Sequence, residues 1–157
     1  MQNKAEEDGR WAYYTNGKVD TSVTTVAQNN YGWWYVKDGY VDFDFYGLAP
    51  NDYGWWVIEA GKVNFDAKTG FYQNEYGYWW CVGGQVQFGT NSLVQDPYDG
   101  SWKYVKGGKW ISDYNGIASN EYGLWRVANG VVDFTDGTYD TKISVVGGVV
   151  LHDPGTM

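Results

Sequence analysis

The stretch YGWWYVKDGYVDF, residues 31–43, sets three aromatic residues side by side just ahead of an Asp38-Gly39 pair. Asp-Gly between two apolar runs is a strong signal for a two-residue β-hairpin turn, because a type I′ turn needs positive φ at both central residues. With this pair as the turn, Val36 faces Val41 across the hairpin. The turn chemistry therefore predicts both the element and its register.

The predicted register divides the hairpin into two faces, because successive strand side chains point to opposite sides. One face is wholly apolar and is expected to be core: Trp34, Val36, Val41 and Phe43. The other mixes rings with charge and is expected to be at least partly wet: Trp33, Tyr35, Lys37, Tyr40, Asp42 and Asp44. Adjacent aromatics therefore cannot all enter one core.

Turn dipeptides that contain glycine recur along the chain. The second residue of each pair is a glycine, and these glycines are spaced 22, 22, 23, 24, 22 and 18 residues apart: Gly17, Gly39, Gly61, Gly84, Gly108, Gly130 and Gly148. A fixed period in this range is typical of stacked repeats. Each repeat reads as an aromatic strand, a turn, a second strand and a loop such as YGLAPND. The chain is therefore predicted to be all-β, a solenoid-like stack of about six to seven hairpins of about 22 residues.

Two hairpins depart from the pattern. Ala60 stands where the other turns have Asn, Asp or Gly, so the third turn is expected to be of another type. Lys103 and Ser112 occupy the positions of Trp34 and Phe43, so the fifth hairpin is expected to be the least well packed, or shifted.

We expect one repeat domain over residues 10–152. Its hairpins are predicted at 10–30, 31–52, 53–75, 76–99, 100–121 and 122–140, with a cap at 141–152. Residues 1–9 are expected to be disordered or an engineered start, and 153–157 a tail.

Charge excludes several classes of partner. The 157 residues carry a formal net charge of −8, with Lys+Arg 11 against Asp+Glu 19. A polyphosphate is bound by clustered Lys and Arg, so neither nucleic acid nor an anionic membrane surface is expected as a partner. No apolar run approaches the length of about 18 residues that a membrane span needs, so no membrane insertion is expected.

The residues of catalytic chemistry are scarce. His152 is the only histidine, and Cys81 takes the position of Val36, where a thiol behaves as a small hydrophobe. Asp20, Asp42 and Asp133 share one repeat position, whereas a catalytic pair needs two unlike environments. We therefore expect no enzyme, no metal site and no cofactor.

The stretch YGWWYVKDGYVDFDFYGLAPND resembles the aromatic hairpin repeats (GWW…DG…VDF…GLA) on surface proteins of Gram-positive gut bacteria, and these are similar to choline-binding and cell-wall-binding repeats. The resemblance covers residues 10–140. It implies a hairpin solenoid, ligand cages built from rings of successive hairpins, and an extracellular place on the bacterial cell surface. Some gut-bacterial proteins that bind host immunoglobulin also resemble assemblies of such repeats.

Rings on the wet face are the candidate binding residues. They are Trp33, Tyr35, Trp55, Tyr78, Trp80, Trp102 and Tyr104. Such a ladder suits stacking on sugars, cradling a quaternary ammonium, or a protein interface rich in Tyr and Trp. The alternative is that these rings only pack one hairpin on the next.

The predicted function is a non-catalytic extracellular binding module for a host protein, for example immunoglobulin, or another partner protein. Variation in the column of Tyr35 favours this reading, as does a negative charge that opposes phosphate-rich polymers. The alternative is a cell-wall polymer or glycan-binding anchor, and a purely structural spacer also stays open.

Overall fold

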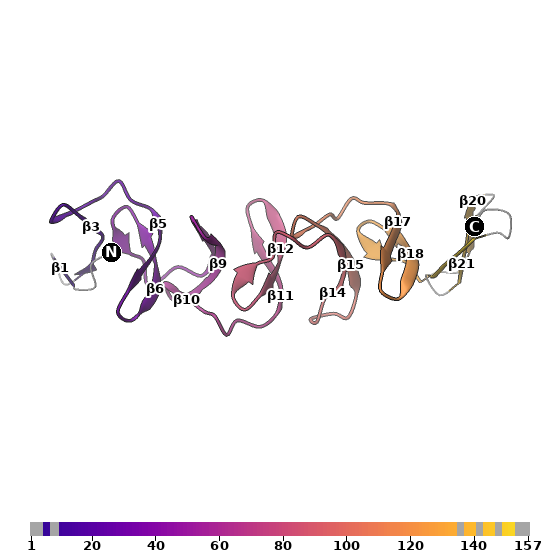
Figure 1. The fold of residues 1–157 in the computed structure, drawn as a ribbon, viewed down its shortest axis with the longest axis horizontal. Coiled ribbons are helices and arrows are strands. Elements are labelled where there is room, and N and C mark those ends of the chain that lie inside the picture. The colour runs from indigo at the N-terminus through magenta and orange to yellow at the C-terminus, as the bar shows by residue number, and fades with distance from the viewer. Residues whose placement is uncertain (1–4, 7–9, 135–136, 141–142, 147–148, 153–157) are drawn as a thin grey trace. The chain divides into compact units, whose positions relative to one another are not determined.

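The computed structural model describes residues 5–6, 10–134, 137–140, 143–146 and 149–152, and every regular element within them is a strand (Figure 1). The all-β prediction and the repeat of antiparallel hairpins are thus confirmed. The chain forms two compact units, Met1–Tyr76 with Cys81–Val86, and Gly77–Trp80 with Gln87–Met157.

The first unit holds the strands of the early repeats. They are β1 (Ala5–Glu6), β2 (Arg10–Trp11), β3 (Tyr14–Thr15), β4 (Lys18–Val19), β5 (Thr25–Asn29), β6 (Gly32–Lys37), β7 (Tyr40–Val41), β8 (Gly47–Asn51), β9 (Gly54–Glu59), β10 (Lys62–Val63), β11 (Gly70–Asn74) and β13 (Gln85–Val86). Strand β12 (Gly77–Val82) contributes residues to both units.

The second unit holds the later repeats. Its strands are β14 (Ser92–Gln95), β15 (Trp102–Lys106), β16 (Lys109–Trp110), β17 (Gly116–Asn120), β18 (Gly123–Ala128), β19 (Val131–Val132), β20 (Gly137–Asp140), β21 (Ile143–Val146) and β22 (Val149–His152). Strand β22 pairs with β18 through Val149 and Trp125. The predicted Gly147-Gly148 turn lies outside the described residues.

Each full repeat is a three-stranded unit rather than a hairpin plus a loop. In the second repeat, β5 pairs with β6 from Thr25↔Val36 to Asn29↔Gly32, and β6 pairs with β7 through Val36↔Val41. The segment read as the loop YGLAPND contains strand β8, which pairs with β9 in the same way. That part of the prediction was wrong. The long first strand would otherwise leave its outer backbone groups unpaired, and the extra strand satisfies them.

The turns keep the predicted register. Asp38 and Gly39 have φ values of 49° and 86°, as the type I′ turn requires. Ala60 and Gly61 adopt almost the same values, 49° and 80°, so the expectation of another turn type was wrong. A left-handed alanine costs about 1–2 kcal/mol. Neighbouring backbone holds the turn in place, because Gly61 donates its N–H to the Phe45 carbonyl (3.0 Å).

The glycine at the second position of each turn also contacts the preceding repeat. The Gly61 carbonyl accepts the N–H of Tyr35 at 2.7 Å, and Gly39, Gly84, Gly108 and Gly130 make the equivalent bond. A Cβ on Gly61 would stand 2.5 Å from the Asp42 carbonyl oxygen. These positions therefore need glycine for close approach as well as for positive φ.

The prediction of core residues is confirmed at the position of Val36 and wrong at the position of Phe43. The buried residues at the Val36 position, all at most 1% exposed, are Val36, Ile58, Cys81, Val105 and Val127. The phenylalanines that were expected beside them are 42–51% exposed: Phe43, Phe65, Phe88 and Phe134. Each follows its short second strand, beyond the last ladder pair, and packs only its edge on a tryptophan, as in Trp34–Phe43 (5.6 Å, 70°).

Candidate functional site

The predicted binding rings of the first unit lie in two settings. Trp33 and Tyr35 are half-buried against the apolar cluster of Val26, Ala49, Ile58 and Val63. The face expected to be wet is therefore partly covered by the next repeat. Trp55, one repeat further on, lies at the edge of a hollow.

In the second unit, too, some of the predicted rings pack against apolar residues and others are exposed. Trp102 and Tyr104 pack against Leu93, Val127 and Val132. Tyr78 is 40% exposed, with its ring edge-on to Trp110 (centroids 5.8 Å apart). Trp80 is half-buried and its backbone donates to the Gly108 carbonyl.

A hollow of about 490 Å³ in the first unit brings two predicted residues together. Tyr35 on β6 and Trp55 on β9 both line it, although they stand one repeat apart. The remaining lining comes from the start of β5, from β8 and from the β11–β12 turn: Thr24, Thr25, Phe45, Leu48, Ala49, Pro50, Asn74, Glu75 and Tyr76.

The rings of this hollow stand in pairs. Tyr35 packs on Phe45 with centroids 4.3 Å apart and planes at 36°, and Trp55 lies 6.2 Å from Tyr76 at 42°. Burial raises the pKa of the Tyr35 phenol, and the nearby carboxylate of Asp42 adds to this effect, so the hydroxyl stays protonated. The site thus offers ring faces, a hydroxyl donor and the exposed Glu75 carboxylate.

Tyr76 belongs to a set of surface tyrosines that the sequence reasoning missed. Tyr31, Tyr53, Tyr76 and Tyr122 are 61–73% exposed. Each of them contacts a tryptophan of the preceding repeat. In the first unit the ring centroids lie 5.6–6.2 Å apart in the pairs Trp11–Tyr31, Trp33–Tyr53 and Trp55–Tyr76. In the second unit the centroids of Trp102 and Tyr122 lie 5.9 Å apart. The recurring pattern N-x-Y-G-x-W at 29–34, 51–56, 74–79 and 120–125 could have revealed them.

An asparagine two residues earlier fixes each of these tyrosines. The Asn74 Oδ1 accepts the N–H of Tyr76 at 2.9 Å, a local turn that asparagine favours. In the third repeat Asn51 Oδ1 accepts two bonds, from the N–H of Tyr53 (2.9 Å) and from the Trp56 indole (2.8 Å). One side chain therefore sets both the surface ring and the ring beneath it.

The second unit repeats the hollow with different chemistry. A cavity of about 420 Å³ is lined by Tyr104 and Leu124 at the positions of Tyr35 and Trp55, and by Lys106. Tyr104 stacks on Tyr114 at 3.9 Å and 12°. Leucine offers no π face, so the aromatic version of the site lies in the first unit.

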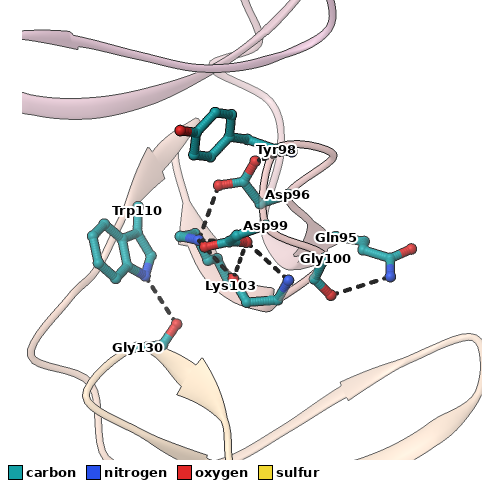
Figure 2. Close-up of polar contacts among 9 residues, drawn as sticks. Gln95, Asp96, Tyr98, Asp99, Gly100, Lys103, Trp110 and Gly130 are labelled. Carbon is teal, nitrogen blue, oxygen red and sulfur yellow. Dashed lines mark hydrogen bonds and ion pairs between the residues drawn. The ribbon is translucent and has the colours of Figure 1, made fainter.

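The fifth repeat was expected to be shifted or the least well packed, and that expectation was wrong. Val105 pairs with Trp110 and Lys106 with Lys109, the same register as in the other repeats, and Val105 is fully buried. Lys103 is buried too, and its ammonium binds Asp96, Asp99 and Ser101 (Figure 2). A charged network here takes the place of a tryptophan.

Ligands for a metal ion do not gather in the described part of the chain. No cluster of three or more His, Cys, Asp or Glu is found among the residues searched. Burial raises the pKa of the Cys81 thiol to about 12, so this sulfur stays protonated. The part of the chain that the structure describes contains no helix that is long and apolar enough to span a membrane.

Among the solved structures to which the chain is similar is an alternansucrase in complex with isomaltononaose. It is 18% identical in sequence, with a TM-score of 0.41 over 90% of the present chain. The present chain spans 12% of that protein's length, and a similarity at this level says nothing about the ligand. Among curated proteins, none matches the sequence.

A family model for the choline-binding repeat matches four segments of about 21 residues: 22–42, 44–64, 67–87 and 113–133. Together they cover more than half of the chain, and each spans a turn glycine, from Gly39 to Gly130. This match favours the wall-polymer alternative and lends no support to a host or partner protein as the ligand. The chain belongs to the choline-binding repeat family.

Proposed function

We propose that this chain is a non-catalytic binding module for a polymer or glycan of the bacterial cell wall, acting at the cell surface. The hollow between Tyr35, Trp55 and Tyr76 carries the proposal. It joins ring faces from successive repeats with one carboxylate, Glu75, at a size that suits a small head group or one sugar unit. Membership of the choline-binding repeat family supports the same reading.

The chemistry of the hollow suits a quaternary ammonium group on such a polymer. A cation without N–H groups is bound by the faces of Trp and Tyr rings, each worth about 0.5–2 kcal/mol. Glu75 adds a negative charge at the rim, and the whole chain carries −8, which attracts a cation from solution. A neutral sugar would use the same rings and could donate hydroxyl hydrogen bonds to the carboxylate, but it would gain no charge–charge attraction from it.

The other predicted residues have supporting roles in this proposal. Trp33 stands against the exposed Tyr53, and this pair would extend the surface of the first unit. Trp102 and Tyr122 form the equivalent pair in the second unit. Tyr78, Trp80 and Tyr104 stay predictions as ligand contacts.

The test is a fluorescence or calorimetric titration of the chain with choline, with neutral oligosaccharides and with purified wall polymer. Trp55→Ala should weaken choline binding about 10- to 30-fold, as expected for a central aromatic contact of about 2 kcal/mol. Glu75→Gln should weaken choline binding by a few-fold and affect a neutral sugar less, because the amide keeps an acceptor oxygen but loses the charge.

Leu124→Ala is the matched control, since it alters the equivalent position of the second unit. Its affinity for choline should equal that of the parent chain. Wall-polymer binding that survives both Trp55→Ala and Glu75→Gln would rule out this hollow as the site. Binding to a host protein, with none to choline or wall polymer, would restore the alternative ligand class.

A further inference from the structure

The fifth repeat contains a buried ammonium group with a full set of acceptors. Lys103 on β15 is 8% exposed, and Asp96, just after β14, is 7% exposed. The Lys103 Nζ lies 2.9 Å from Asp96 Oδ2, 3.1 Å from Asp99 Oδ2 and 2.6 Å from Ser101 Oγ. Three acceptors match the three N–H bonds of an ammonium group.

An aromatic ring stands beside this group. The Lys103 Nζ is 5.4 Å from the centroid of the Trp110 ring, within the range of a cation–π contact. The Trp110 indole donates to the Gly130 carbonyl at 2.9 Å, which holds the ring in place (Figure 2). Two carboxylates, a hydroxyl and a ring therefore surround one cation.

In other repeats, an asparagine and a tryptophan take the positions of Asp96 and Lys103. Asn120 accepts the Trp125 indole at 2.9 Å, as Asn51 accepts that of Trp56. Asp96 and Lys103 take these two positions, so a neutral pair has become a charged pair.

The residue across from the position of Lys103 varies among the repeats: it is Gln85 opposite Trp56 and Val149 opposite Trp125. Lys62 pairs with Trp34, and Lys109 with Trp79, each with its ammonium over the ring at 5.3 Å and 5.9 Å. Lys103 instead pairs with Val131. A second ammonium there would repel that of Lys103, so the uncharged valine is compatible with the buried lysine.

We propose that the fifth repeat is a binding site for a primary ammonium ion which the chain keeps filled with its own Lys103. The side chain acts as an internal ligand, so this repeat is closed to cations from outside. Removing it leaves two carboxylates, a hydroxyl and a ring face around a space of the shape of an alkylammonium ion. This inference does not depend on the ligand proposed for the first unit.

The test uses Lys103→Ala, which deletes three carbons and the nitrogen, and n-propylammonium, which replaces them. Thermal unfolding of the variant is followed in n-propylammonium chloride, in n-propanol with sodium chloride, and in tetramethylammonium chloride at equal ionic strength. At about ten times its Kd, propylammonium should raise the ratio of folded to unfolded variant about tenfold. The parent chain, whose site is filled, should not respond.

The comparison ligands separate the causes. n-Propanol has the same carbon chain without charge, and tetramethylammonium has the charge without N–H donors. Lys103→Met keeps the side-chain volume and should not respond to propylammonium. Equal rescue by n-propanol or tetramethylammonium, or no rescue at all, would overturn the proposal.

A measurement on the parent chain covers the case in which Lys103→Ala fails to fold. Nitrogen-detected NMR of lysine ammonium groups should show that the Lys103 protons exchange with water at least tenfold more slowly than those of the exposed Lys37 and Lys106. Exchange as fast as in those two residues would overturn the proposal equally.

Discussion

The Asn51 side chain ties a surface ring to a half-buried one, because its Oδ1 accepts both the Trp56 indole (2.8 Å) and the N–H of Tyr53 (2.9 Å). Its Nδ2 also donates to the Val26 carbonyl of the preceding repeat, at 3.0 Å. Each such bond contributes about 1 kcal/mol. Asn51→Ala should therefore lower the free energy of unfolding by about 2–3 kcal/mol in urea titrations.

Asn51→Asp is the graded control. It keeps the oxygen that serves Trp56 and Tyr53, but it replaces the donor to Val26 with a second oxygen that faces the Val26 carbonyl. Its loss should be clearly smaller than that of Asn51→Ala. Equal losses would show that the bond between repeats, and not the one to the indole, dominates.

Gly61 and Gly17 offer a matched pair at the same turn position. Both have positive φ, 80° and 83°, but a Cβ on Gly61 would meet the Asp42 carbonyl at 2.5 Å, whereas one on Gly17 would meet nothing within 4 Å. Gly17→Ala should cost about 1 kcal/mol for the backbone alone. Gly61→Ala should cost about 1–3 kcal/mol more, because the repeats must move apart. Chemical denaturation of both variants gives the comparison, and similar losses would refute the packing role.

The Cys81 thiol should be protected from alkylation in the folded chain. It is 1% exposed, and burial raises its pKa from the ordinary 9.0 to about 12. At pH 8 iodoacetamide should react far more slowly with the native chain than with the urea-unfolded chain, because the thiolate is the nucleophile. Because the pKa of the thiol is higher in the folded than in the unfolded chain, its neutral form contributes its full stability below pH 9. That contribution to the free energy of unfolding is lost as the pH rises toward 12. Mass spectrometry of the alkylated chain measures the rate, and equal rates in both states would contradict the assigned burial.

Asp99 should make stability depend on pH in acid. Hydrogen bonds from Ser101, first from its side chain and then from its backbone, lower the pKa of the Asp99 carboxyl to about 2, and Lys103 adds to this. A lowered pKa gives a contribution that is complete above pH 3.8 and is lost as the pH falls to about 2. The melting temperatures of the parent chain and Asp99→Asn should differ at pH 5 and converge near pH 2. A constant difference would contradict the assignment.

The sequence fell short wherever a side chain's setting depends on the neighbouring repeat. Gly47–Asn51 belongs to the segment predicted as a loop, yet it pairs with β9 as a full strand. Phe43 alternates as a core residue should, but it lies past the last ladder pair of β7 and stays 46% exposed. The tyrosine of the N-x-Y-G-x-W pattern is visible in the sequence, but its contact with a tryptophan of the preceding repeat depends on how the repeats stack.

By itself the sequence determined the repeat period, the turn positions, the register of Val36 on Val41 and the buried column that begins there. These features follow from local causes: positive φ at two turn residues and the alternation of side chains along a strand. Only the tertiary structure decided that Tyr35 and Trp55 share one hollow with Glu75, and that Lys103 is a buried ion-pair partner of Asp96 rather than an exposed defect. Both outcomes depend on groups brought together by stacking and turns, and spacing along one strand says nothing about which groups those will be.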